Sequence, residues 1–269
     1  MTTGDIETAK ATLLDSTAAL DARIRALYVI KQLRDATAVA ILLEAIDTTD
    51  SVLLQHEILY NLGQFGAGEA CMNRLMEVAT TPEKYNEVSR HEAIEAIGAI
   101  GQEAAVPFLE DLAAKTADCP PVQESCVLAV DRIRLEAKLG KEGYQKLVSP
   151  EFGSVDPAPA CEERSVAALK AVLMDPSKHL FERYRAMFAL RDLRTPESIA
   201  ALSDSLRADQ SSCLFRHEVA FVLGQLEEPA SIPALVESLK DGAEHGMVRH
   251  EAAEALGAMA DAKTWDLLA

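Results

Sequence analysis

The chain has few aromatic residues, no long apolar run and only five cysteines, and each shortage excludes a class of protein. Aromatic residues make up 5% of the 269 residues, with a single tryptophan. No apolar run approaches the roughly 18 residues of a membrane-spanning helix, and the polar residues 2–5 do not resemble a signal peptide. The cysteines form no C-x-x-C pair, so we expect reduced thiols, packed as small apolar side chains, in a cytoplasmic protein.

Basic residues are also scarce, since 26 Lys and Arg stand against 43 Asp and Glu, for a formal net charge of −17. A nucleic-acid partner requires a basic surface, so we expect none. The chain also lacks a P-loop, a Rossmann glycine motif and any pattern that indicates a Ser-His-Asp or Cys-His catalytic arrangement. The acidic balance favours a basic partner or a cavity that attracts cations, and solubility alone explains it equally well.

The sequence does contain internal repeats. Residues 90–100 (RHEAIEAIGAI) and 249–259 (RHEAAEALGAM) are identical at eight of eleven positions. Similar units recur about every 33 residues within each half of the chain, and the two halves are offset by about 160 residues. We count four units in the first half and three in the second, because the next unit would fall beyond Ala269. The second half is therefore expected to lack a terminal repeat.

Each unit has the pattern of two helices. The second helix has apolar residues at i, i+3, i+4 and i+7. In four units a glycine (Gly63, Gly98, Gly224 or Gly257) falls late in that helix, where close packing or a helix end would use it. The first helix often begins near proline, and strand signals are absent. Residues 248–257 match the V-R-x-x-A-x-x-A-L-G pattern of HEAT repeats. We therefore predict an all-α solenoid of HEAT-type helical hairpins in two pseudo-symmetric lobes, 1–139 and 161–269, joined by a Gly- and Pro-rich linker, 140–160.

Four His-Glu dipeptides occupy equivalent places in the repeats: His56-Glu57, His91-Glu92, His217-Glu218 and His250-Glu251. Equivalent positions of adjacent repeats stack side by side, so each half should bring two imidazoles and two carboxylates together. Two His and one carboxylate per metal is the ligand set of iron sites that handle O₂, and the inventory suits two metals. Zinc fits less well, because no cysteine belongs to the pattern. If the lobes close on one another, all four pairs converge.

Simpler readings of the same residues are a helix cap, a solvated ion pair, or a repeat consensus inherited without function. One His-Glu pair would favour a cap or a solvated pair, but four at repeat spacing are not a coincidence. Inherited consensus is disfavoured because the units around Ile24, Glu124 and Tyr184 keep the apolar pattern without His-Glu.

Four His-Glu motifs in a duplicated HEAT-type chain resemble the deoxyhypusine hydroxylase family, over nearly the whole sequence. The resemblance implies a di-iron centre with an O₂-derived peroxo species, which hydroxylates deoxyhypusine on eukaryotic translation initiation factor five-A. It implies iron ligands at His56, His91 and Glu92 for one ion, and at His217, His250 and Glu251 for the other. Glu57 and Glu218 would face the substrate amines. All eight positions match, and we expect a monomer.

Two other classes of function stay open. A bilin lyase or a related enzyme can be built on similar repeats, but it would not require four His-Glu pairs. A non-enzymatic scaffold that binds a peptide would carry no stoichiometric metal.

Overall fold

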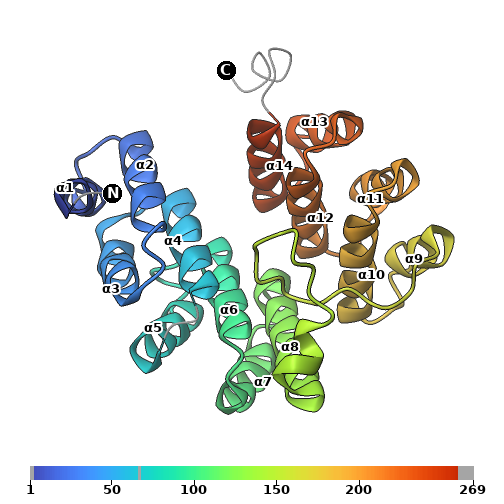
Figure 1. The fold of residues 1–269 in the computed structure, drawn as a ribbon, viewed down its shortest axis with the longest axis horizontal. Helices are drawn as coiled ribbons and strands as arrows, with labels where there is room; N and C mark the ends of the chain where they lie inside the picture. Colours follow the sequence, from blue (N-terminus) through green and yellow to red (C-terminus); the bar gives the residue numbers. More distant parts are fainter. Residues whose placement is uncertain (1–2, 66–67, 260–269) are drawn as a thin grey trace. The chain divides into compact units, whose positions relative to one another are not determined.

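The computed structural model describes residues 3–65 and 68–259, and this part of the chain is helical without a strand (Figure 1). The predicted all-α class is confirmed. No helix in these residues is both long enough and apolar enough to cross a membrane.

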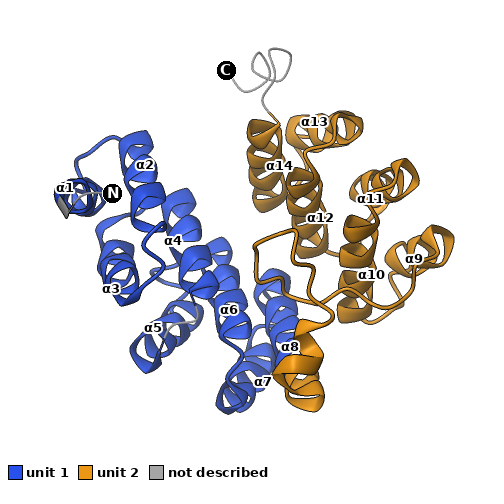
Figure 2. Ribbon diagram, viewed as in Figure 1, with its two compact units in different colours: residues 1–133 blue, residues 134–269 orange. Residues whose placement is uncertain are grey.

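The contacts divide the chain into two compact units, Met1–Ile133 and Arg134–Ala269 (Figure 2). The first unit contains α1 (Thr3–Leu14), α2 (Leu20–Ile30), α3 (Ala36–Ala45), α4 (Val52–Gln64), α5 (Glu69–Thr80), α6 (Glu87–Ile100), α7 (Val106–Lys115) and the start of α8 (Pro120–Gln145), with two short 3-10 helices, η1 (Ile46–Thr48) and η2 (Glu103–Ala105). The second unit contains α9 (Val166–Leu173), α10 (Leu180–Leu193), α11 (Pro196–Ala208), α12 (Cys213–Leu226), α13 (Ile232–Lys240) and α14 (Gly246–Ala258), with η3 (Pro229–Ser231).

The helices pair as hairpins in chain order, four of them from α1 to α8 and three from α9 to α14. These are the numbers that the repeats predict. Polar side chains start several helices: Ser51 accepts a hydrogen bond from the Leu54 amide at the start of α4, and Asn86 accepts one from the Ser89 amide at the start of α6. Pro107 and Pro233 lie in the first turns of α7 and α13, as predicted.

A repeated arginine ties the two helices of a hairpin together. The guanidinium of Arg90 on α6 donates to the carbonyl of Ala79 in the last turn of α5, at 2.9 Å, and Arg249 on α14 donates to Leu239 at the end of α13. A cation at the carboxyl end of a helix satisfies a carbonyl and complements the helix dipole. Because successive residues of a helix differ by about 100° in direction, the residue after each arginine points away from the first helix of its own hairpin. That next residue is His91 or His250.

The late glycines allow the second helices of adjacent hairpins to pack closely. A Cβ atom at Gly63 of α4 would lie 2.8 Å from the Cα of Ala96 on α6, and one at Gly224 of α12 would lie 3.0 Å from the Cα of Ala255 on α14. Neither glycine ends its helix, so close packing is the reason for both. Glycine therefore brings α4 against α6 and α12 against α14, which are the helices that carry the His-Glu pairs.

The first unit ends at Ile133, within α8. The sequence predicts a later end for the first lobe, at residue 139. Residues 146–165 contain no helix and belong to the second unit. They pack against its helices: Asp156 pairs with the buried Arg191 of α10 at 2.9 Å, and Ser154 accepts a hydrogen bond from Gln225 of α12. This part of the Gly- and Pro-rich segment is thus held by ion pairs and hydrogen bonds.

Candidate metal centre

In the first unit, the His-Glu pairs of α4 and α6 meet in a buried cluster. Glu92 Oε2 lies 3.1 Å from His56 Nε2 and 3.4 Å from His91 Nε2. The side chains of all three residues are at most 7% exposed. Glu57 Oε1 lies on the other side of the His56 ring, 3.7 Å from Nδ1. Two imidazole nitrogens and a carboxylate oxygen therefore come together from two helices.

The cluster is strongly negative apart from its imidazoles. Burial by itself lowers the pKa of His56, but the charges of Glu92 and Glu57 and their hydrogen bonds outweigh it, so the pKa is raised well above 6.5. The surroundings of His56 therefore favour a cation, which can be a proton on the ring or a divalent metal; a metal that displaces the proton would release it on binding.

His91 is held from its second ring nitrogen as well. Its Nδ1 lies 3.2 Å from the hydroxyl oxygen of Ser125 on α8 and 3.7 Å from Glu95 Oε2 on its own helix. The ligand atoms of His91, Glu92 and Glu95 all lie within 4.8 Å of one another. The ring is thus fixed on both edges, with Nε2 toward Glu92 and His56.

The second unit repeats much of this arrangement on α12 and α14. His217 Nε2 lies 3.4 Å from Glu251 Oε2, which corresponds to the contact between His56 and Glu92. His250 Nε2 lies 3.1 Å from Glu254 Oε1, and His250, Glu251 and Glu254 form a cluster within 4.8 Å. Glu218 is 2% exposed, so the second carboxylate of the pair on α12 is buried too. The two units differ in the histidine of their second His-Glu pair. The side chain of His250 is 26% exposed, whereas that of His91 is fully buried.

The predicted residues that each unit brings together are His56, His91 and Glu92 in the first and His217, His250 and Glu251 in the second. Three neighbours of these residues were not predicted: Glu95, Glu254 and Ser125. Glu95 and Glu254 follow a histidine by four residues, a spacing that puts both on one face of a helix, so the sequence did contain a signal for them. Ser125 has no comparable signal.

The donor set fits a divalent metal. Ligand atoms bound at about 2.0–2.2 Å, at right angles about the ion, lie about 3 Å apart, close to the separations of Glu92 Oε2 from the two Nε2 atoms. Imidazole with carboxylate suits iron. None of the five cysteines, all of which lie in the described residues, forms a disulfide. Burial raises the pKa of Cys71 to about 11 and of Cys126 to about 12, so these two thiols stay protonated and pack as apolar groups.

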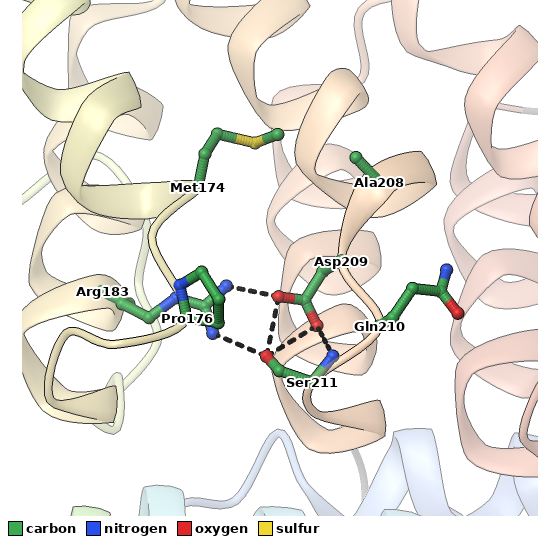
Figure 3. A pocket seen from close by; sticks show the side chains of 7 residues that line it. All are labelled: Met174, Pro176, Arg183, Ala208, Asp209, Gln210 and Ser211. Carbon is green, nitrogen blue, oxygen red and sulfur yellow. Dashed lines mark hydrogen bonds and ion pairs between the residues drawn. The ribbon is translucent and has the colours of Figure 1, made fainter.

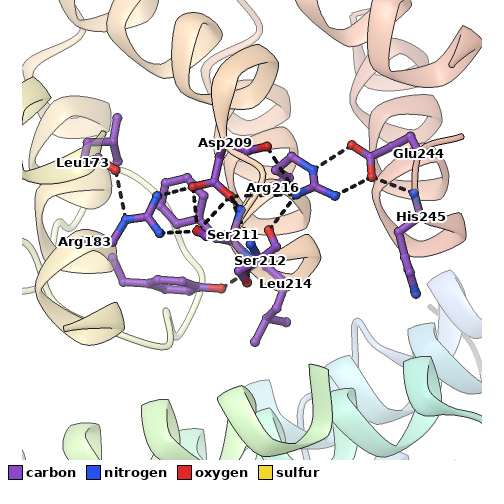
Figure 4. A network of polar contacts seen from close by, with 11 residues as sticks. Leu173, Arg183, Asp209, Ser211, Ser212, Leu214, Arg216, Glu244 and His245 are labelled. Atoms are coloured by element: carbon purple, nitrogen blue, oxygen red, sulfur yellow. Dashed lines mark hydrogen bonds and ion pairs between the residues drawn. The ribbon is translucent and has the colours of Figure 1, made fainter. Parts of the chain in front are cut away.

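A pocket in the second unit lies away from the His-Glu residues, between α9 and the segment that leads into α12 (Figure 3). Its lining residues are Met174, Pro176, Arg183, Ala208, Asp209, Gln210 and Ser211. The one cation of this pocket, Arg183, is paired with Asp209 and also donates to Leu173 O and the Ser211 hydroxyl. The network continues through Arg216 to Glu244 (Figure 4). These groups satisfy one another and connect successive repeats, so the pocket has a structural explanation.

Comparison with known proteins first identifies the class. Residues 42–131 and 208–269 match the family model for HEAT repeats, and residues 182–207 match the PBS lyase HEAT-like repeat. The chain is a HEAT-repeat protein, as the sequence predicts.

More specific relatives are deoxyhypusine hydroxylases. The protein of that name from Drosophila melanogaster is 45% identical over 183 residues, which cover 67% of this chain and 57% of the relative. The Homo sapiens protein is 42% identical over 192 residues, 71% of this chain and 61% of the relative. These alignments thus span about three fifths of the relatives' length.

A solved structure extends the similarity. The structure of human deoxyhypusine hydroxylase in complex with glycerol is 40% identical and superposes with a TM-score of 0.89, over 98% of this chain and 88% of that one. The chain therefore belongs to the deoxyhypusine hydroxylase family.

Proposed function

We propose that this protein is an iron-dependent monooxygenase. In this proposal it hydroxylates the deoxyhypusine side chain of eukaryotic translation initiation factor five-A, with two iron ions. The observation that carries the proposal is the buried cluster in which Glu92 lies within 3.4 Å of the Nε2 atoms of both His56 and His91. Its counterpart on α12 and α14 supplies a second set of ligands. Membership of the deoxyhypusine hydroxylase family supports deoxyhypusine as the substrate.

Each unit holds one ion in this proposal. The first ion takes His56, His91 and Glu92 as ligands, and the second takes His217, His250 and Glu251. Two bound iron(II) ions would each supply one electron, so that, with two protons, one atom of O₂ enters a C–H bond while the other leaves as water. The protein contributes rigid helices, which hold the ligands in place, and buried surroundings, which keep bulk water from the site.

Glu57 and Glu218 are proposed to bind the substrate's amines. Deoxyhypusine is a long aliphatic side chain with cationic nitrogens, and carboxylates that are not ligands to iron can fix which carbon is presented for reaction. Both residues are at most 8% exposed, and a buried carboxylate gains more from a cation than an exposed one. The net charge of −17 would also attract a basic loop of the partner protein.

Metal content and turnover test this function. We expect purified protein to bind about two irons per chain, the number that two His-His-Glu ligand sets require. Incubation of the iron(II)-loaded protein with O₂ and deoxyhypusine-bearing factor should then add one oxygen atom to the substrate. Stoichiometric zinc in the purified protein, together with no turnover after iron loading, would refute the proposal and favour a scaffold that binds peptides.

A further inference from the structure

We propose that Ser125 is a positioning residue for the metal ligand His91. Its hydroxyl oxygen accepts a hydrogen bond from His91 Nδ1 and so reserves the lone pair of Nε2 for the metal. The inference rests on the proposed metal site of the first unit. It adds a residue of the fourth hairpin, which has no His-Glu pair of its own, to that site.

The repeat geometry explains why this serine reaches His91. Ser125 lies on α8, 34 residues after His91, and it therefore occupies the place of the histidine in the next repeat. Equivalent positions of adjacent repeats stack side by side, as His56 and His91 do with ring centroids 6.4 Å apart. A serine at this place puts a small hydroxyl against the far edge of the His91 ring, at 3.2 Å from Nδ1.

The direction of the hydrogen bond follows from a third group. The Ser125 hydroxyl lies 2.7 Å from the carbonyl oxygen of Pro121, which has no proton to donate. The hydroxyl proton therefore goes to Pro121, and the oxygen of Ser125 offers a lone pair to His91. Nδ1 must carry the proton of that bond. Glu95 Oε2, 3.7 Å from the same nitrogen, is also an acceptor and favours the same tautomer. Glu92 Oε2, 3.4 Å from Nε2, acts in the opposite sense, so the hydrogen bond to Ser125 is what reserves Nε2 for the metal.

Burial makes this contact specific. His91 is fully buried and Ser125 is 3% exposed, so the bond is shielded from bulk water. An imidazole that binds metal through one nitrogen commonly donates from the other, and loss of that partner typically lowers metal affinity about 10- to 100-fold. We expect an effect of this size for the ion bound by His91.

The variants Ser125→Ala and Ser125→Thr separate the hydroxyl from the fold. Alanine removes the acceptor, whereas threonine keeps it. Ser205→Ala is the matched control, because Ser205 is also fully buried on a helix and its hydroxyl donates to a backbone carbonyl of its own helix, that of Leu202. Each full-length variant is titrated with Co²⁺ after removal of metal, and its helical content is compared by circular dichroism.

We expect Ser125→Ala to bind one of two Co²⁺ ions about 10- to 100-fold more weakly, with Ser125→Thr and Ser205→Ala close to the parent protein. Nitrogen-15 spectra of the metal-free parent protein should show a proton on Nδ1 of His91. Wild-type affinity in Ser125→Ala, or a neutral His91 with its proton on Nε2 in the parent, would overturn the inference. If Ser125→Ala does not fold, Ser125→Cys, a weaker acceptor of similar size, replaces it in the same titration.

A failure of the proposed function can be told apart from a failure of this inference. If the parent protein binds neither Co²⁺ nor iron, the proposed function is wrong. The tautomer of His91 in the metal-free protein then still decides whether Ser125 orients the ring.

Discussion

Replacing Gly63 with alanine should force α4 and α6 apart. The added Cβ would lie 2.8 Å from the Cα and 3.0 Å from the Cβ of Ala96, and neither atom can rotate away. Reaching ordinary contact requires a shift of roughly half an ångström between the two helices. Overpacking of this kind costs about 1–3 kcal/mol. The higher helix propensity of alanine offsets about 1 kcal/mol, so we expect a net loss of up to about 2 kcal/mol in unfolding free energy.

The same shift should weaken metal binding, because His56 is on α4 while His91 and Glu92 are on α6. Metal ligands have to be held within about 0.5 Å of their working geometry. Gly257→Ala is the matched control: it changes the same position of the repeat on α14, where an added Cβ meets no atom of the described residues within 4 Å.

Urea unfolding of metal-free protein, followed by circular dichroism, measures the first effect, and iron titration measures the second. Gly257→Ala should leave both unchanged or raise stability by up to about 1 kcal/mol. If Gly63→Ala were as stable as Gly257→Ala, close packing of α4 on α6 would not be the reason for the glycine.

Two further predictions concern the carboxylates. Glu92→Ala and Glu251→Ala should each lower the iron content by about one ion per chain, the share of one ligand set, whereas Glu57→Ala and Glu218→Ala should keep most iron and raise KM for the substrate. Equal iron loss in all four variants, measured by elemental analysis, would contradict this division. Burial raises the pKa of Asp209, but its hydrogen bonds from Arg183, Ser212 and Ser211 outweigh burial and lower it overall. Ionised Asp209 therefore stabilises the fold above its unfolded pKa of about 3.9, and this contribution is lost as the pH falls through the lower, folded value. Asp209→Asn should thus reduce stability at neutral pH and flatten its decline below about pH 4; urea unfolding curves that fall in parallel with the parent would argue against this role.

The sequence was sufficient to predict the helical repeats because each repeat buries the same apolar positions against its neighbours. The Arg90 and Arg249 motifs, the late glycines and the apolar spacing are local signals, and the structure places those of α6 and α14 in the second helix of their hairpins. The four His-Glu pairs were visible for the same reason. Their roles as ligands remain a proposal, supported by the clusters on α4 and α6 and on α12 and α14.

Other features depend on neighbours that no local pattern reveals. Gly63 and Gly257 occupy the same position of the motif, yet an added Cβ meets Ala96 at one and none of the described residues at the other. Ser125 is an ordinary helix serine in sequence and becomes significant only because the repeat stack sets it against His91. The composition of residues 140–160 predicts a linker, but it does not predict that Asp156 pairs with a buried arginine.

Oxygen-isotope labelling tests the central proposal most directly. The iron(II)-loaded chain is incubated with ¹⁸O₂ and deoxyhypusine-bearing translation initiation factor five-A, and the modified lysine is examined by mass spectrometry. We expect one labelled oxygen atom to enter the side chain, and His56→Ala and His217→Ala to abolish its incorporation. A protein that holds both irons and binds the factor, yet incorporates no label, would show that it is not this monooxygenase.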